Sequence, residues 1–279
     1  MTATRKQFHN LDLLKAIAIY FVLVYHFDYM NSEIVTDGSW ESMLNYMGMA
    51  IFSTCVPIFF IVNGGLLITK PNLDLRKHYS KTLRVAVLTL IWGVITVIAL
   101  SLIWNEPKGI REIFRTVFGL HQRWVSHLWF MEALVVIYFL YPMIHLAFHK
   151  NQQIFLSFLA IICLFSFGNN LIGMVLTVAS EATGKFSNTN FLVNHFSEFN
   201  PLRGLYGFSI GYFLIGGFVF QYKEQILEKV SKAKAWGIMI ISTILLGGFG
   251  ILLSLRENVK WDVVFGGYES IFTLINVRP

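Results

Sequence analysis

Charged residues are scarce in this chain of 279 residues: Asp, Glu, Lys and Arg together make up 14%, whereas soluble domains carry about 25%. The mean hydropathy is correspondingly high, at +0.59. Several uncharged stretches reach the length of about 20 residues with which a helix crosses a bilayer. Backbone groups in lipid must be paired within the protein, which a helix achieves within its own segment. The sequence therefore predicts an all-α, polytopic membrane bundle.

Several motifs that would define common functions are missing. The chain has no nucleotide-binding glycine loop, no metal-ligand cluster at usable spacing and no nucleophile elbow, which argues against ATP-driven pumping and serine hydrolysis. Its two cysteines, Cys55 and Cys163, fall inside apolar runs and are predicted to be packing residues. The net charge of +6 does not require a nucleic-acid partner, because membrane proteins collect Lys and Arg in cytoplasmic loops.

The hydropathy pattern predicts about eight membrane spans within a single domain covering residues 1–279. The expected spans are residues 11–30, 44–69, 85–104, 128–148, 154–176, 205–220, 235–255 and 263–277. Polar loops are expected between them, among them residues 70–84 and 222–234. Residues 105–126 mix arginines with phenylalanines, a pattern typical of an amphipathic helix at the membrane interface.

The distribution of basic residues predicts the orientation. With the N-terminus inside, twelve lysines and arginines fall in the expected inner segments and eight in the outer ones. Because Lys and Arg gather on the cytoplasmic side, we expect a multi-pass protein of the cell membrane with a cytoplasmic N-terminus. The loop at residues 70–84 would then face the cytosol.

The first expected span carries three ionisable residues, Asp12, Lys15 and His26. Eleven helical steps of about 100° bring residue 26 to within about 20° of Lys15, about 16 Å farther along the axis. Asp12 lies one turn before Lys15, close enough to pair with it. Ionisable groups inside a membrane are costly, which favours a function. The alternative is a snorkelling anchor in which Lys15 reaches the headgroups.

Two further groups of charge have both a functional and a plain interpretation. The basic run at residues 70–84 includes Arg76, Lys81 and Arg84, and clustered cations can hold the phosphates of a cytosolic ligand. The same run would also suit a loop that rests on anionic lipids. Glu132 lies about five residues into the fourth span, where a carboxyl group is protonated, paired with a cation or exposed to a cavity.

Two other segments combine apolar residues with unusual ones. Residues 57–64, PIFFIVNG, contain a proline and Asn63 and are followed by a second glycine, which allows a membrane helix to bend and to approach another helix closely. His127 and Trp129 open the fourth span, where Trp129 suits an interfacial anchor and His127 a solvated position. Helix packing and anchoring explain both segments without a binding site.

Read together, these segments resemble the acyltransferase-3 family of integral-membrane acyltransferases. The first span of that family has an Arg or Lys, ten residues and then a His, and Lys15 and His26 match this pattern. Asp12 occupies the acidic position just before it. Lys81 and Arg84 fall where the family has a cytoplasmic R-x-x-R.

Two more segments extend the resemblance. Residues 57–64 are similar to the family's P-x-F-F-x-x-S-G, with Asn63 in place of the usual Ser. Residues 127–130 and 138–142 are similar to its H-L-W-F…Y-L-x-x-P block. The resemblance covers residues 8–148 well and residues 200–220 loosely, and the four motifs occur in the family's order.

The resemblance implies a membrane-bound O-acyltransferase that moves an acyl group, commonly acetyl, from cytosolic acyl-CoA to a hydroxyl of a cell-envelope glycan. Acyl-CoA would be the donor substrate, and no bound cofactor is expected. The basic loop would hold the CoA phosphates, Lys15 would mark the inner mouth of a channel, and His26 would meet the acceptor hydroxyl. The catalytic residues implied are His26, Asp12 and Glu132. The substrate-binding residues implied are Lys15, Arg76, Lys81, Arg84, Asn63, His127 and Trp129.

Two departures from the family pattern leave alternatives open. Asn63 keeps a polar group but changes its donors and acceptors, and family members usually have ten spans, so the chain is either a short relative or a truncated one. A transporter or flippase for a glycan precursor would use the same intramembrane ionisable residues as a relay. A scaffold without catalytic activity is the third possibility. Dependence on acyl-CoA separates transfer from transport.

Overall fold

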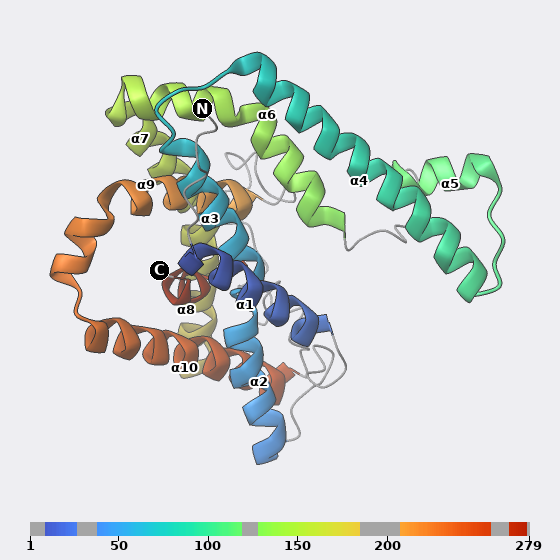
Figure 1. Cartoon of the computed structure of the whole chain (residues 1–279). Helices are drawn as coiled ribbons and strands as arrows, with labels where there is room; N and C mark the ends of the chain where they lie inside the picture. Colours follow the sequence, from blue (N-terminus) through green and yellow to red (C-terminus); the bar gives the residue numbers. More distant parts are fainter. Residues whose placement is uncertain (1–8, 27–37, 119–127, 185–206, 258–267, 278–279) are drawn as a thin grey trace. The chain divides into compact units, whose positions relative to one another are not determined.

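The computed structural model describes residues 9–26, 38–118, 128–184, 207–257 and 268–277, and every regular element in this part of the chain is a helix (Figure 1). The elements are α1 (His9–His26), α2 (Trp40–Phe52), α3 (Cys55–Ile68), α4 (Leu75–Ile103), α5 (Ile110–Val117), α6 (Trp129–Lys150), α7 (Gln152–Cys163), η2 (Leu164–Gly168), α8 (Asn169–Ala182), α9 (Gly207–Lys229), α10 (Lys232–Glu257) and α12 (Ile271–Asn276). The predicted all-α class is confirmed.

Within the described residues, five helical stretches are long and apolar enough to cross a membrane: α2 with α3, α4, α6, α7 through α8, and α10. They coincide with five of the expected spans. The first and sixth expected spans correspond to α1 and α9, which are 18 and 23 residues long but are not among these five. The chain is thus a multi-pass membrane protein.

The second span is interrupted between α2 and α3, and proline explains the break. The ring nitrogen of Pro57 carries no hydrogen and cannot donate to the carbonyl of Ser53, four residues earlier. Hydroxyl groups turn back onto the preceding helix at this point: Ser53 Oγ donates to the carbonyl of Ala50 at 2.9 Å and Thr54 Oγ1 to that of Ile51 at 2.7 Å. The chain continues as a helix on both sides of the break.

The expected loop at residues 70–84 is mostly helical, which corrects the sequence prediction. α4 begins at Leu75, because the side chain of Asp74 caps the helix by accepting the backbone N–H of Lys77 at 3.0 Å. Hydropathy marks where the apolar part of a span begins, whereas the helix itself extends farther. Arg76, Lys81 and Arg84 therefore lie on the first turns of α4.

Three boundaries in the second half of the chain also differ from the prediction. α9 continues to Lys229 through most of the expected loop at residues 222–234, with a non-helical backbone at Tyr222. α8 continues to Ala182, beyond the expected end of the fifth span, and a π-helical turn, η2, precedes it. The expected eighth span is wrong as a continuous crossing. Its described part contains a turn followed by the six-residue α12, which is too short to cross a bilayer.

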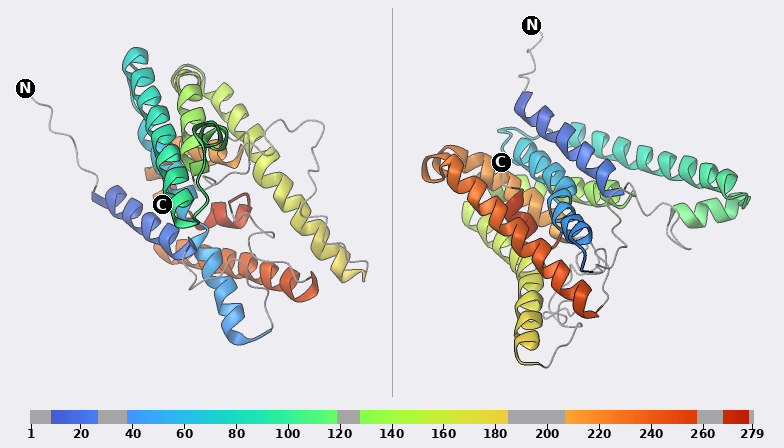
Figure 2. Two further views of the ribbon diagram at one scale, coloured as in Figure 1. Left: turned by 90° about the vertical axis from the view of Figure 1, so that its right-hand side faces the viewer. Right: turned by 90° about the horizontal axis from the view of Figure 1, so that it is seen from below.

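The chain forms two compact units, residues 1–69 with 153–279, and residues 70–152. In the first unit α3 packs on α9 and on α1, while α10 lies beside α2 (Figure 2). One buried cluster joins four of its helices: Tyr25 from α1, Tyr46 and Met49 from α2, Met174 from α8, and Leu246 and Phe249 from α10 among others. In the second unit α4 packs on α5 and on α6.

Candidate functional site

The first helix carries the ionisable residues at the edge of its packed face. Ala18 and Tyr25 are buried, and Lys15 is half-buried on the same side of α1. Asp12 and Ile19 are exposed, Ile19 to 53%. Residue 26 lies within about 20° of Lys15 around the helix axis. The stripe predicted from the sequence thus borders the face that packs against α3.

The end of α1 is held by a group of aromatic residues, Tyr25, Phe208, Tyr212 and Tyr268, called here the tyrosine cluster. The rings of Tyr25 and Tyr268 are 6.4 Å apart, and Phe208 stacks on Tyr268 at 5.7 Å. Tyr212, which is fully buried, donates from its hydroxyl to the carbonyl of Tyr268 at 2.8 Å. His26 directly follows Tyr25 and ends α1. Its side chain lies outside the described part of the structure.

The tyrosine cluster was not predicted from the sequence. Its members come from α1, α9 and the turn before α12, and no local pattern connects such distant segments. Cys55 joins the same region, with its Sγ 3.9 Å from the hydroxyl of Tyr268. The sequence signal was limited to the position of Phe208 and Tyr212 within the expected sixth span. Among the described residues no three His, Cys, Asp or Glu side chains are grouped so as to hold a metal ion.

The PIFFIVNG segment forms the closest helix contact in the first unit. A Cβ atom added to Gly64 would overlap the carbonyl oxygen of Phe213 in α9, and one added to Gly216 would overlap a carbonyl of α3. Close approach of this kind is typical of small residues at membrane-helix interfaces. Asn63 is half-buried, and its Nδ2 donates to the carbonyl of Phe59 at 2.9 Å. One amide hydrogen of Asn63 is thereby used inside its own helix.

The second unit presents the cations of the basic run on the surface of α4. Lys77, Lys81 and Arg84 are all exposed, and their spacing of four and three residues places them along one side of the helix. These three residues are called here the basic face. Arg76 is also exposed but lies about 140° around the axis from Lys81. Lys77 was not among the binding residues predicted from the sequence, although its position one turn before Lys81 indicates it.

Two histidines fix the start of α4 against α6. His78 Nε2 donates to the carbonyl of Tyr138, and His145 Nε2 donates to the carbonyl of Lys70, both at 2.7 Å. A carbonyl oxygen only accepts, so each Nε2 carries a hydrogen. Together with the Asp74 cap, these bonds hold the segment that leads into the basic face. The cations therefore lie near the end of a helix whose position on α6 is fixed by these bonds.

The remaining predicted residues lie at the opposite end of α6. Trp129 and Glu132 are half-buried in its first turn, and Glu132 is about 20 Å along the helix from His145. His127 lies outside the described residues. The structure thus places Asp12, Lys15 and Asn63 in the first unit. It places Arg76, Lys81, Arg84, Trp129 and Glu132 in the second.

The chain is similar to a known protein family. A family model described as an acyltransferase domain matches residues 8–276, nearly the whole chain, and it spans both units. Neither a curated protein nor a solved structure matches the chain.

Proposed function

The chain belongs to the acyltransferase-3 family, and from that premise we propose that it transfers an acyl group, in the simplest case acetyl, from cytosolic acyl-CoA to a hydroxyl of a cell-envelope glycan. Transfer of acyl groups is the chemistry of the family. Beyond this chemistry, we propose the donor, the acceptor and the roles of individual residues. The observation that carries it is the basic face on α4, held against α6 by two histidines.

The basic face is arranged in a way that helix stability alone does not favour. The N-terminal end of a helix carries a partial positive charge, so cations are stabilising near the opposite end. Here Lys77, Lys81 and Arg84 lie in the first three turns of α4, and the Asp74 carboxylate caps the helix by accepting the backbone N–H of Lys77. Clustered Lys and Arg side chains supply charged hydrogen bonds to phosphate. We therefore assign the CoA phosphates to this face.

The acceptor side of the reaction requires a base. The acceptor oxygen attacks the thioester carbonyl carbon, its proton passes to the imidazole of His26, the C–S bond breaks, and the CoA thiolate leaves and is protonated. The ordinary histidine pKa of about 6.5 suits this task near neutral pH. Asp12 and Lys15 are proposed to act at the inner end of α1, and Glu132 is the second candidate for the base that takes the acceptor proton. Asn63, His127 and Trp129 are proposed to contact the substrates.

The family match supports transfer chemistry and gives no support to the transport alternative. A transporter would use the ionisable residues of α1 and Glu132 as a relay, but it has no requirement for acyl-CoA. Binding of acyl-CoA by the purified protein is accordingly the measurement that tests the proposed function most directly.

Removing two charges from the basic face should weaken donor binding. We expect the double substitution Lys81→Gln and Arg84→Gln to raise the Kd for acetyl-CoA at least about tenfold, because each charged hydrogen bond contributes about 1.5–3 kcal/mol. Isothermal titration of the detergent-solubilised protein measures this Kd. The matched control is Lys232→Gln with Lys234→Gln, which removes two exposed lysines from the first turn of α10. If the two double variants have equal Kd values, the basic face rests on lipid and does not bind the donor.

The donor assignment also requires that the basic face lies in the cytosol. We expect a single cysteine at Ser39 to react with an impermeant thiol reagent in intact cells and one at Ser80 to react only after permeabilisation. Both positions are exposed, and both variants are made after Cys55 and Cys163 have been replaced. Labelling at residue 80 but not at residue 39 in intact cells would reverse the topology and remove the donor site from the cytosol.

A further inference from the structure

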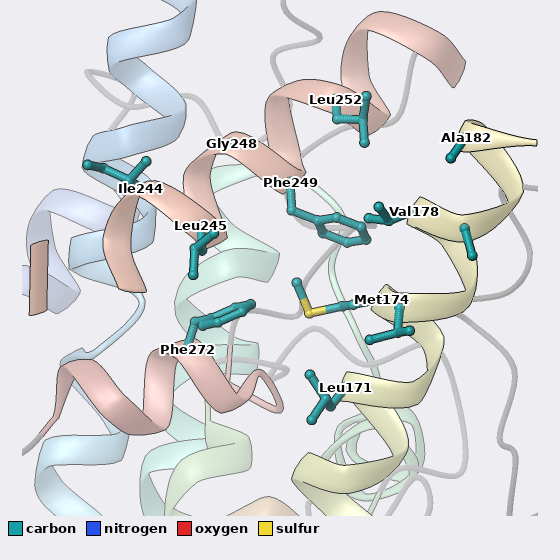
Figure 3. Close-up of a pocket in the computed structure, with 12 residues that line it drawn as sticks. Leu171, Met174, Val178, Ala182, Ile244, Leu245, Gly248, Phe249, Leu252 and Phe272 are labelled. Atoms are coloured by element: carbon teal, nitrogen blue, oxygen red, sulfur yellow. The ribbon is translucent and has the colours of Figure 1, made fainter. Parts of the chain in front are cut away.

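An apolar groove of about 570 Å³ runs between α8 and α10 in the first unit (Figure 3). Met174 and Val178 line it from α8, Gly248 and Leu252 from α10, and Phe272 closes it from α12. The side chains drawn in Figure 3 contribute only carbon and one sulfur. Because none of the described side chains that line the groove is polar, water bound there would lose hydrogen bonds to them without replacement. Its chemistry favours a hydrocarbon occupant.

The helices that form the groove indicate where that hydrocarbon comes from. Both α8 and α10 belong to stretches long and apolar enough to cross a membrane. Val178 and Ile244, at the sides of the groove, are exposed to 48% and 54%. The medium around such side chains is lipid, and an unfilled groove would forfeit the dispersion contacts of its lining atoms. A lipid chain is thus the occupant available at this position.

The floor of the groove connects with the candidate site. Met174 and Phe249 line the groove and also belong to the buried cluster that contains Tyr25. Tyr25 is the residue before His26 and belongs to the tyrosine cluster. A chain lying in the groove therefore contacts side chains of the same buried cluster to which Tyr25 belongs. α1, α8 and α10 all contribute residues to this cluster.

We propose that the groove binds the hydrocarbon chain of the acceptor, so that the acceptor is a lipid-linked glycan. This inference rests on the proposed function and adds the class of its second substrate. A tail held between α8 and α10 would keep the attached sugar near the end of α1. Attack on the thioester then proceeds from a bound, oriented hydroxyl, which is a large contribution to catalysis in general.

Gly248 offers a substitution that fills the groove without disturbing the fold. A Cβ atom added there meets no heavy atom within 4 Å, so the side chain in Gly248→Leu extends into the space that the lipid chain would occupy. Gly237 is the matched control. It lies on the same helix, a Cβ atom there also meets nothing within 4 Å, and it does not line the groove. Gly237→Leu adds the same atoms at a different place.

The experiment uses the full-length protein in nanodiscs and a diacyl glycolipid whose acyl chain carries a photoactivatable diazirine. We expect crosslinks to peptides containing residues 171–182 and 244–252 in the unchanged protein and in Gly237→Leu, and at least a fivefold loss in Gly248→Leu. A phosphatidylcholine probe with the same diazirine chain should label these peptides at least fivefold less.

Each contrary result has a defined meaning. Labelling that Gly248→Leu leaves unchanged would overturn the groove as the binding site. Equal labelling by the phosphatidylcholine probe would mean that the groove holds bulk lipid, which overturns the acceptor role. If labelling follows the expectation but acetyl-CoA does not bind to the unchanged protein, the proposed function fails and the groove stands as a glycolipid site without a part in transfer.

Discussion

The variant His26→Gln is expected to insert normally, to bind acetyl-CoA with unchanged affinity and to transfer acyl groups at least about a hundredfold more slowly, the lower range for general-base catalysis. An alcohol must lose its proton as it attacks a thioester, and glutamine matches the size and polarity of histidine without a basic nitrogen. The described part of α1 supports the position, because Tyr25 is buried and anchors the end of the helix. The assay follows isotopically labelled acetyl-CoA into the glycan by mass spectrometry.

The control for this prediction lies on the same helix. His9→Gln makes the same chemical change at the first residue of α1, about 25 Å along the axis from residue 26, and should leave the transfer rate within about twofold. A near-normal rate in His26→Gln would remove histidine as the base. Glu132→Gln would then be the variant to assay, since Glu132 is the other carboxyl or imidazole group assigned to the acceptor proton.

Gly64→Ala is expected to destabilise the protein by about 3 kcal/mol, the upper range for overpacking in a core. The added methyl group would overlap the carbonyl oxygen of Phe213, and a carbonyl in a helix cannot swing aside as a flexible side chain can. α3 and α9 would have to separate along their contact, which loosens the packing of the neighbouring glycines as well. Thermal unfolding of the detergent-purified variant, followed by intrinsic fluorescence, measures the effect.

Two glycines on α10 serve as controls for Gly64. In Gly237→Ala and Gly248→Ala the added methyl group meets no heavy atom within 4 Å. Alanine is favoured over glycine inside a helix by about 1 kcal/mol, so both variants should be as stable as the unchanged protein or slightly more stable. If Gly64→Ala unfolds at the same temperature as these controls, the close contact between α3 and α9 is not what holds the first unit together.

The helical class and most of the spans were predictable because hydropathy reports the membrane environment directly. Helix ends were less predictable, because a helix extends past the lipid where a cap and good helix formers allow it. Asp74 starts α4 about ten residues before the apolar part of the span, and the cations of the basic face continue that helix. The prediction of the eighth span was wrong because a turn at residues 268–270 interrupts the apolar segment.

The sequence predicted only those parts of the candidate site that lie within a single helix. The placement of Lys15 and residue 26 on one face of α1 follows from helical periodicity, and so does the grouping of Lys81 with Arg84. The contacts of Tyr212 with Tyr268, or of His145 with the carbonyl of Lys70, join segments 56 and 75 residues apart. No period within a helix encodes such contacts. Asn63 was predicted as a polar group within the membrane, but the hydrogen bond from its amide to the carbonyl of Phe59 is seen only in the structure.

The contact between Gly64 and α9 can form only after the ribosome has synthesised both helices. Its two sides lie about 150 residues apart, and at about 5–20 residues per second the ribosome needs roughly 8–30 seconds to cover that distance. During this interval α3 is already inserted but its partner has not yet been made, so its glycine face borders lipid or an insertion chaperone. A nascent chain halted before α9 would carry an incomplete first unit, which membrane proteases that survey unassembled helices should remove.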